Sequence, residues 1–145
     1  MRLRSSLVLA HRWASLVAAL LWMVQATTGI FAVFHWEIDD ATVDGAERGL
    51  DLDAIAARAA ALTPPESGLS VDSIWSTAGA RNRFDIFLVG EPPVAGRVVR
   101  VDGAGRVLRT RRDGELLAAG GWVDTLVVLH QSLHAGNRGK WILGL

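Results

Sequence analysis

The residues best suited to chemistry in this 145-residue chain are its four histidines, because the sequence has no cysteine. They are His11, His35, His130 and His134. Neutral imidazole is the commonest protein ligand for metals, and a haem iron takes axial histidines from helices that face each other. The lack of cysteine removes disulfides, thiolate metal sites and cysteine nucleophiles. Metal or haem ligation is therefore the chemistry that these residue types could support.

The spacing of the histidines relates all four to apolar helices. His11 and His35 flank an apolar run and are 24 residues apart, which is about 36 Å along a helix. His130 and His134 are four residues apart, so they share one helical face. Histidine near a membrane helix is costly and favours a functional explanation. An equally open alternative is four interfacial histidines that hydrogen-bond to lipid headgroups or to the backbone.

The apolar run from Trp13 to Phe34 contains no charged residue and no histidine. As a helix its 22 residues span roughly 33 Å, about the thickness of a bilayer core. We predict a transmembrane helix over residues 13–35 after a basic cytoplasmic lead over residues 1–12, because arginines precede the run and acidic residues follow it. Val24-Gln25-Ala26 resembles a signal-peptide cleavage site, but the apolar run continues past it and favours an uncleaved span.

Residues 36–120 are predicted to form a small extracytoplasmic domain. Residues 38–49 are acidic and contain glycine, which indicates a linker, and apolar spacing predicts a helix over residues 52–62. Segments rich in β-branched and aromatic residues predict antiparallel strands over residues 71–77, 83–89, 96–101 and 106–110. The connection Asp102-Gly103-Ala104-Gly105 is typical of a tight hairpin. The fold class is therefore an α+β membrane protein.

The predicted hairpin is rich in arginine. Its arginines are Arg97, Arg100, Arg106, Arg109, Arg111 and Arg112. They could attract an anionic ligand or lipid headgroups, but a solvated face of the sheet is the favoured interpretation. Over the whole chain 15 basic residues balance 15 acidic ones, so no nucleic-acid partner is expected. The G-x-S-x-G, phosphate-loop and dinucleotide-binding patterns are absent, and hydrolysis is not predicted.

Residues 121–145 are predicted to form an interfacial helix and the start of a second transmembrane helix. Trp122, Leu126, Leu129 and Leu133 form one apolar stripe. Residues 136–140 are predicted to break the helix, and residues 141–145 look like the opening of another span, although five residues cannot cross a bilayer. We therefore expect the N-terminal part of a multi-span protein, with the lipid bilayer and further transmembrane helices as partners.

Three segments carry a family resemblance that covers nearly the whole chain. They are His11-Arg12-Trp13 with Thr28-Gly29 and the exit sequence FHWEID at 34–39, the hairpin VVRVDGAGRVL at 98–108, and LHQSLHAGNRGKWILGL from Leu129. Together they resemble PepSY-associated membrane proteins. The first and last segments look like that family's first two membrane helices, and the middle of the chain resembles its extracytoplasmic PepSY domain.

The resemblance implies a bacterial inner-membrane protein with several spans and a periplasmic central domain, often acting in iron uptake. Some members are haem-containing reductases of ferric siderophores, which implies haem b as cofactor and a ferric siderophore as partner, with reductase activity only in the larger protein. By position the candidate haem ligands are His11, His35, His130 and His134. His35 and His134 are the first choice for iron on the outer side, and His130 could orient His134 or serve a second site. The alternative function is a membrane-anchored PepSY-like binding module without catalytic activity.

Overall fold

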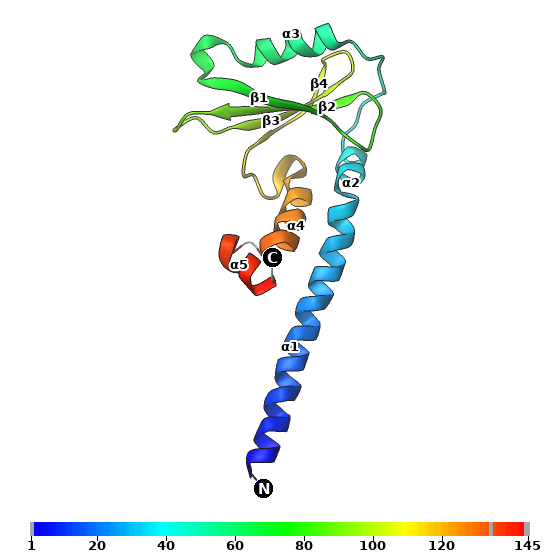
Figure 1. The fold of residues 1–145 in the computed structure, drawn as a ribbon. Helices are drawn as coiled ribbons and strands as arrows, with labels where there is room; N and C mark the ends of the chain where they lie inside the picture. Colours follow the sequence, from blue (N-terminus) through cyan, green and yellow to red (C-terminus); the bar gives the residue numbers. More distant parts are fainter. Residues whose placement is uncertain (1, 134, 144–145) are drawn as a thin grey trace. The chain divides into compact units, whose positions relative to one another are not determined.

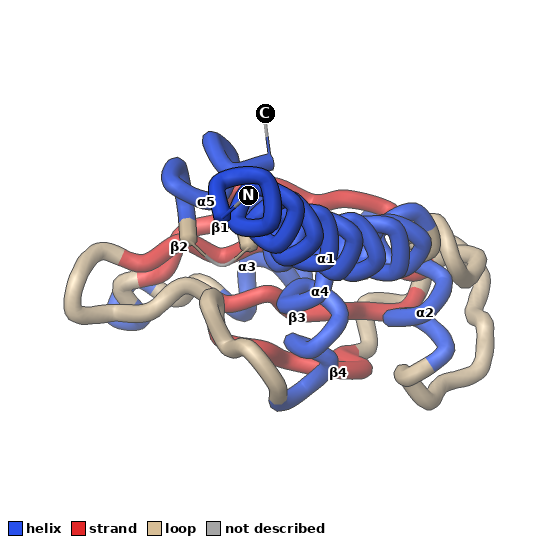
Figure 2. Tube along the Cα trace, turned by 90° about the horizontal axis from the view of Figure 1, so that it is seen from below, coloured by secondary structure: helices blue, strands red, loops and turns tan. Residues whose placement is uncertain are grey.

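The computed structural model of the chain describes residues 2–133 and 135–143. The chain divides into two compact units, which are considered separately. The helical unit comprises residues 1–33 and 126–145, and the sheet unit comprises residues 34–125. Figures 1 and 2 show the helices and strands that make up each unit.

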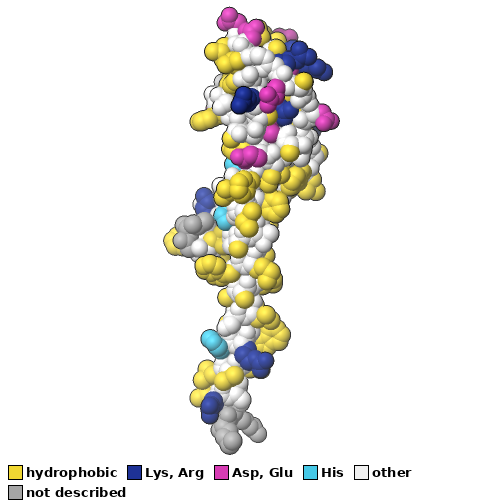
Figure 3. Space-filling view, turned by 90° about the vertical axis from the view of Figure 1, so that its right-hand side faces the viewer, with side chains coloured by type: hydrophobic (Ala, Val, Ile, Leu, Met, Phe, Trp, Pro, Cys, Tyr) yellow, Lys and Arg dark blue, Asp and Glu magenta, His cyan; other side chains and the backbone are white. Residues whose placement is uncertain are grey.

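The helical unit begins with α1 (Arg2–Val33), a single helix of 32 residues. Its segment Leu3–Val33 is the one helix in the described part of the chain that is long and apolar enough to cross a membrane. The predicted span is therefore helical to Val33, and the helix begins at Arg2 because the basic lead contains no glycine or proline. Figure 3 shows apolar side chains along the surface of α1 and arginine toward its N-terminal end.

The C-terminal part contains α4 (Gly121–Ser132) and α5 (Gly136–Leu143). The predicted helix break over residues 136–140 is wrong, because this segment is helical. The break comes earlier, at Leu133, which has a φ of 51°, and a left-handed residue ends a helix. Gly139 does not break α5, because its missing side chain lets the helix pack against the carbonyl group of Ser132.

The sheet unit is built on four antiparallel strands in the order β1-β2-β3-β4. They are β1 (Leu69–Ser76), β2 (Arg83–Gly90), β3 (Arg97–Asp102) and β4 (Val107–Arg112). The four predicted strands and the hairpin between the last two are confirmed, with Asp102 and Arg106 closing the turn through a backbone hydrogen bond of 2.9 Å. The predicted α+β fold class is confirmed as well.

One face of the sheet packs against α3 (Leu52–Leu62), which matches the predicted helix (Figure 1). The buried core between them consists of Ile55, Ala59, Ile86, Leu88, Val99 and Val101. Asp51 caps the helix, since its side chain accepts a hydrogen bond of 2.9 Å from the backbone N–H of Ala54. The chain leaves α3 through Pro64 and the 3-10 turn η1 (Pro65–Ser67).

The opposite face of the sheet carries α2 (His35–Ala41). The predicted linker over residues 38–49 is therefore wrong for its first four residues, which are helical. Asp39 and Asp40 are buried rather than solvated, because arginines of the sheet neutralise them. A second 3-10 turn, η2 (Ala118–Gly120), joins the sheet to α4.

Candidate functional site

His130 lies in the part of α4 that belongs to the helical unit, against a small-residue position of α1. A Cβ atom placed on Gly29 would lie 3.1 Å from Cε1 of His130, so the imidazole packs directly on the glycine backbone. Oγ1 of the buried Thr28 lies 3.3 Å from Nδ1 of the same ring. Small and hydroxyl residues are what allow two membrane helices to approach this closely.

The hydrogen bonds of Thr28 favour one tautomer of His130. The Thr28 hydroxyl donates its proton to the Val24 carbonyl oxygen, at a distance of 2.8 Å. With the hydroxyl proton donated to Val24, the Thr28 oxygen accepts from His130 in the tautomer that carries the proton on Nδ1. The lone pair of Nε2 is then available for a metal, and a hydrogen bond at the other nitrogen is how proteins orient a ligating imidazole.

The imidazole of His130 lines a cavity of about 290 Å³ formed by α1, α4 and α5. The lining residues are Leu21, Trp22, Gln25, His130, Ile142 and Leu143. This volume is near the lower limit of small-molecule sites, about 300 Å³. Nε2 of Gln25 is buried and has no hydrogen-bond partner among the described residues. An unpaired buried amide is unfavourable, so the site provides a donor for a polar group.

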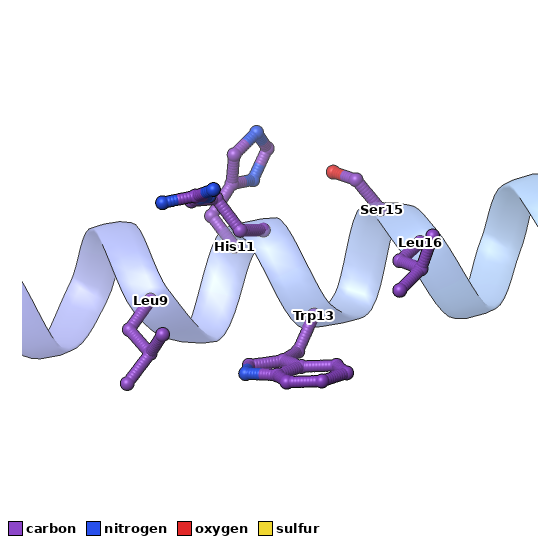
Figure 4. A pocket seen from close by; sticks show the side chains of 6 residues that line it. Leu9, His11, Trp13, Ser15 and Leu16 are labelled. Carbon is purple, nitrogen blue, oxygen red and sulfur yellow. The ribbon is translucent and has the colours of Figure 1, made fainter.

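The structure places the other predicted histidines differently. His35 is the first residue of α2 and belongs to the sheet unit, where its ring is tilted by 39° against Trp36 with centroids 4.7 Å apart. His11 is exposed on α1, and Figure 4 shows it projecting from the side of the helix opposite to Trp13. The hollow beside His11 is lined by residues of α1 only and is open on its other side. His134 lies outside the described residues.

Within residues 2–133 and 135–143, no group of three or more histidine, aspartate and glutamate side chains gathers as a metal site. A haem iron needs only axial protein ligands, so one oriented imidazole beside a cavity is the relevant arrangement. The sequence did not single out Thr28 as the partner of His130. The contact joins residues 102 positions apart, and a threonine in a membrane helix commonly bonds only to its own backbone.

The sheet unit contains a second concentration of polar side chains, which the sequence analysis missed. Its six members are Asp39 and Asp40 of α2, Arg83 and Asp85 of β2, Arg100 of β3 and Arg109 of β4. Three carboxylates face three guanidinium groups, so the cluster is balanced in formal charge. We refer to these six residues as the ion cluster.

Arg100 is the centre of the ion cluster and is only 2% exposed. Its guanidinium group donates to both carboxylate oxygens of Asp85, at 2.8 and 2.7 Å, and to Oδ1 of Asp40 at 2.9 Å. A further ion pair of 2.8 Å reaches Asp39. Burial lowers the pKa of Arg100, but the hydrogen bond and charge of Asp85, with the charges of Asp39 and Asp40, outweigh this effect and raise the pKa above its ordinary value.

The ion cluster corrects the prediction of a solvated arginine face. Arg100 is buried, Arg109 pairs with Asp39, and Arg111 forms an ion pair with Asp124 of α4. Only Arg97, Arg106 and Arg112 are exposed as that prediction requires. The missed signal was alternation: Arg83 and Asp85 share one side of a strand whose other side is apolar, so the second face of the sheet had to be covered.

The fold and the site together define a membrane-anchored α+β protein in which a long apolar helix precedes a four-stranded sheet domain. The model of the PepSY-associated TM region matches residues 8–145, and the chain belongs to this family. No curated protein and no solved structure gives a significant match to the chain.

Proposed function

We propose that the chain is the N-terminal, haem-binding part of a membrane-bound electron-transfer protein that reduces ferric siderophores during iron uptake. The observation that supports this proposal is the orientation of His130. Its Nδ1 lies 3.3 Å from the Thr28 hydroxyl oxygen, and a hydrogen bond there leaves Nε2 for a metal. Membership of the PepSY-associated TM family supports a membrane protein.

The described residues would supply one axial side of a haem site, because the cavity of about 290 Å³ is smaller than a haem. Nε2 of His130 would hold the iron, Thr28 would keep the ring in one tautomer, and Gly29 would leave room for the ring. The buried amide of Gln25 would donate to a polar substituent. When bound, haem supplies one-electron chemistry between ferric and ferrous iron. The lining of the cavity is mostly apolar.

The remaining histidines belong to the same proposal. His35, at the end of the first span, remains a candidate ligand on the outer side, and His134 remains an alternative to His130. His11 is proposed to serve a separate haem on the inner side, with its partner from another transmembrane helix. The orientation of His130 moves the first choice from His134 to His130.

The proposed location is the bacterial inner membrane, with a cytoplasmic N-terminus and a periplasmic sheet unit. Its support is the arginine bias before the apolar run. A reporter inserted at Gly68, in the exposed turn after η1, tests the orientation. A reporter that requires export should be active there, and activity of a cytoplasm-dependent reporter would contradict the orientation.

The haem site is tested by reduced-minus-oxidised absorption spectra of membranes that carry the complete protein. His130→Ala and His35→Ala should each remove the band of the outer haem, whereas His11→Ala should leave it intact. Gln131→Ala is the matched control, because Gln131 is the exposed neighbour of His130 on α4. Thr28→Val should weaken or shift the outer band, whereas Thr27→Val, at an exposed position of α1, should not.

An unchanged spectrum in both His130→Ala and His35→Ala would refute the assigned ligands. Loss of the band in His134→Ala but not in His130→Ala would return the ligand role to His134. A complete protein that contains no haem would refute electron transfer, and the membrane-anchored binding module would then be the better interpretation.

A further inference from the structure

Both chain connections out of the sheet unit leave from the same face of the sheet. On this face Arg100 forms ion pairs with Asp39 and Asp40 of α2. Arg111 lies two residues after Arg109 on β4, so it is on the same face. Arg111 forms an ion pair with Asp124 at the start of α4. The opposite face is covered by α3 through the apolar core. We call the first of these the α2-bearing face.

Strand pairing places Trp75 on the α2-bearing face. Trp75 of β1 lies opposite Asp85 of β2, and residues opposite each other in an antiparallel pair point to the same side. The side chain of Asp85 points toward α2, because it holds Arg100. Trp75 is nevertheless 62% exposed, at the edge of the sheet where α2 does not cover it.

The segment between β4 and α4 adds two exposed leucines to the same face. Leu116 and Leu117 are 55% and 75% exposed. The carbonyl oxygen of Leu116 accepts a hydrogen bond from the Thr125 hydroxyl group. Gly120, three residues after Leu117, lies against Asp39 of α2, because a Cβ atom added to this glycine would be 2.7 Å from Oδ1 of Asp39. The segment therefore lies beside α2.

Three of the four acidic side chains of α2 and β2 carry little free charge, and the fourth, Glu37 of α2, is exposed. Asp39, Asp40 and Asp85 are buried and paired with arginines. The α3 side begins instead with the exposed Asp51 and Asp53. Tryptophan and leucine beside neutralised acids suit the headgroup region of a bilayer, where amphipathic aromatic rings are enriched. Unpaired carboxylates would be disfavoured there by desolvation and by anionic lipids.

We propose that the α2-bearing face is a lipid-contacting surface, with Trp75, Leu116 and Leu117 inserted among the headgroups of the membrane that anchors α1. The occupant follows from connectivity. A single residue separates α1 from α2, so the one helix able to span a membrane in the described part of the chain is attached to this face. This inference depends on the membrane anchor and not on the haem site.

The chain has no cysteine, so single-cysteine variants can be spin-labelled without other changes. The test positions are Trp75→Cys and Leu117→Cys, and the controls are Ala57→Cys and Ala60→Cys on the exposed side of α3. Each labelled full chain is reconstituted in vesicles of phosphatidylethanolamine and phosphatidylglycerol. Collisions with oxygen, which partitions into lipid, are compared with collisions with a water-soluble nickel chelate.

Labels at positions 75 and 117 should show a higher ratio of oxygen to nickel collisions than the α3 labels. Vesicles without phosphatidylglycerol should retain this difference, because the contact is mainly apolar. A ratio equal to that of the α3 labels would refute the proposal. Protection from both reagents would also refute it, since that result means that protein rather than lipid covers the face. Circular dichroism of each variant confirms that the comparison is made on folded protein.

Discussion

Replacement of Arg100 by methionine is the most direct test of what holds α2 on the sheet. The guanidinium group of Arg100 makes three hydrogen bonds of 2.7 to 2.9 Å to Asp85 and Asp40 and a further ion pair with Asp39. Methionine has a similar length and removes the charge together with all five N–H donors. In the described residues, Asp85 would then keep no ion-pair partner, while Arg83 and Arg109 would still face the two aspartates of α2.

The expected loss of stability follows from the uncompensated charge. Removing one partner of a buried ion pair costs about 3–5 kcal/mol, because the remaining charge stays desolvated. A domain of this size has a total unfolding free energy of about 5–15 kcal/mol. Arg100→Met should therefore remove a large fraction of the stability of the sheet unit. Arg100→Lys keeps the charge but loses the planar fork, so its loss should be smaller.

The measurement is pulse proteolysis of the detergent-solubilised chain across a urea series, with cleavage in the sheet unit as readout. Arg97→Met is the matched control, because Arg97 lies on the same strand and is exposed. Adding Asp85→Asn to Arg100→Met should recover part of the loss, since it removes the orphaned charge. A change below about 1 kcal/mol in Arg100→Met, within the range of exposed ion pairs, would refute this account.

The raised pKa of Arg100 predicts that its contribution to stability is insensitive to pH. A group whose folded pKa is raised contributes fully below its ordinary pKa and loses that contribution only as pH rises through the folded value. The difference between the wild-type chain and Arg100→Met should therefore not shrink between neutral pH and mildly alkaline pH. A difference that disappears in that range would contradict the assignment.

Three further substitutions test the sheet unit with the same urea assay. Ile86 is fully buried against α3, so Ile86→Ala should lower the free energy of unfolding by about 2–5 kcal/mol and Ile86→Val by less than about 1.5 kcal/mol. Equal effects of the two substitutions would place Ile86 outside the core. Asp51→Ala removes the cap of α3 and should cost about 1 kcal/mol, which Asp51→Asn should largely restore. Gly105→Val should destabilise the hairpin, because Gly105 has a φ of +71° and a Cβ there would lie 2.5 Å from the Ala54 carbonyl oxygen, and an unaltered midpoint would contradict the turn geometry.

The fold was predictable where the pattern of residues was local. The apolar run, the spacing of Leu52, Ile55 and Ala59, and the glycines of the hairpin each determine an element over a few residues. Antiparallel pairing of consecutive strands then follows from short connections. The sequence therefore predicted the long N-terminal helix, α3, α4, the four strands and the α+β class without long-range information, but it predicted neither α2 nor α5.

The ion cluster could not be predicted because its reasons are not local. Asp39 and Asp40 follow a membrane helix in an acidic, glycine-containing stretch, which indicates a solvated linker. They are helical and buried because Arg100, 60 and 61 residues away, neutralises both. The tautomer of His130 depends likewise on Thr28, which lies 102 positions earlier. Buried charged residues of this kind can be identified only when the fold shows which distant residues pair with them.

The composition of the ion cluster explains why α2 is held by charge rather than by apolar packing. Replacing buried ion pairs by apolar residues often preserves or raises the free energy of unfolding, so an ion cluster does not attach a helix more strongly than apolar packing would. The ion cluster does fix the register of α2 on the sheet, because Arg100 can pair with both aspartates in only one position of the helix. An apolar contact would also allow positions shifted by one helical turn. The helix that follows the membrane span by one residue is thus fixed in register on the sheet. An arrangement that presents Trp75 and the two leucines to lipid requires this fixed register, since one turn of slippage would displace the sheet by about 5.4 Å along α2.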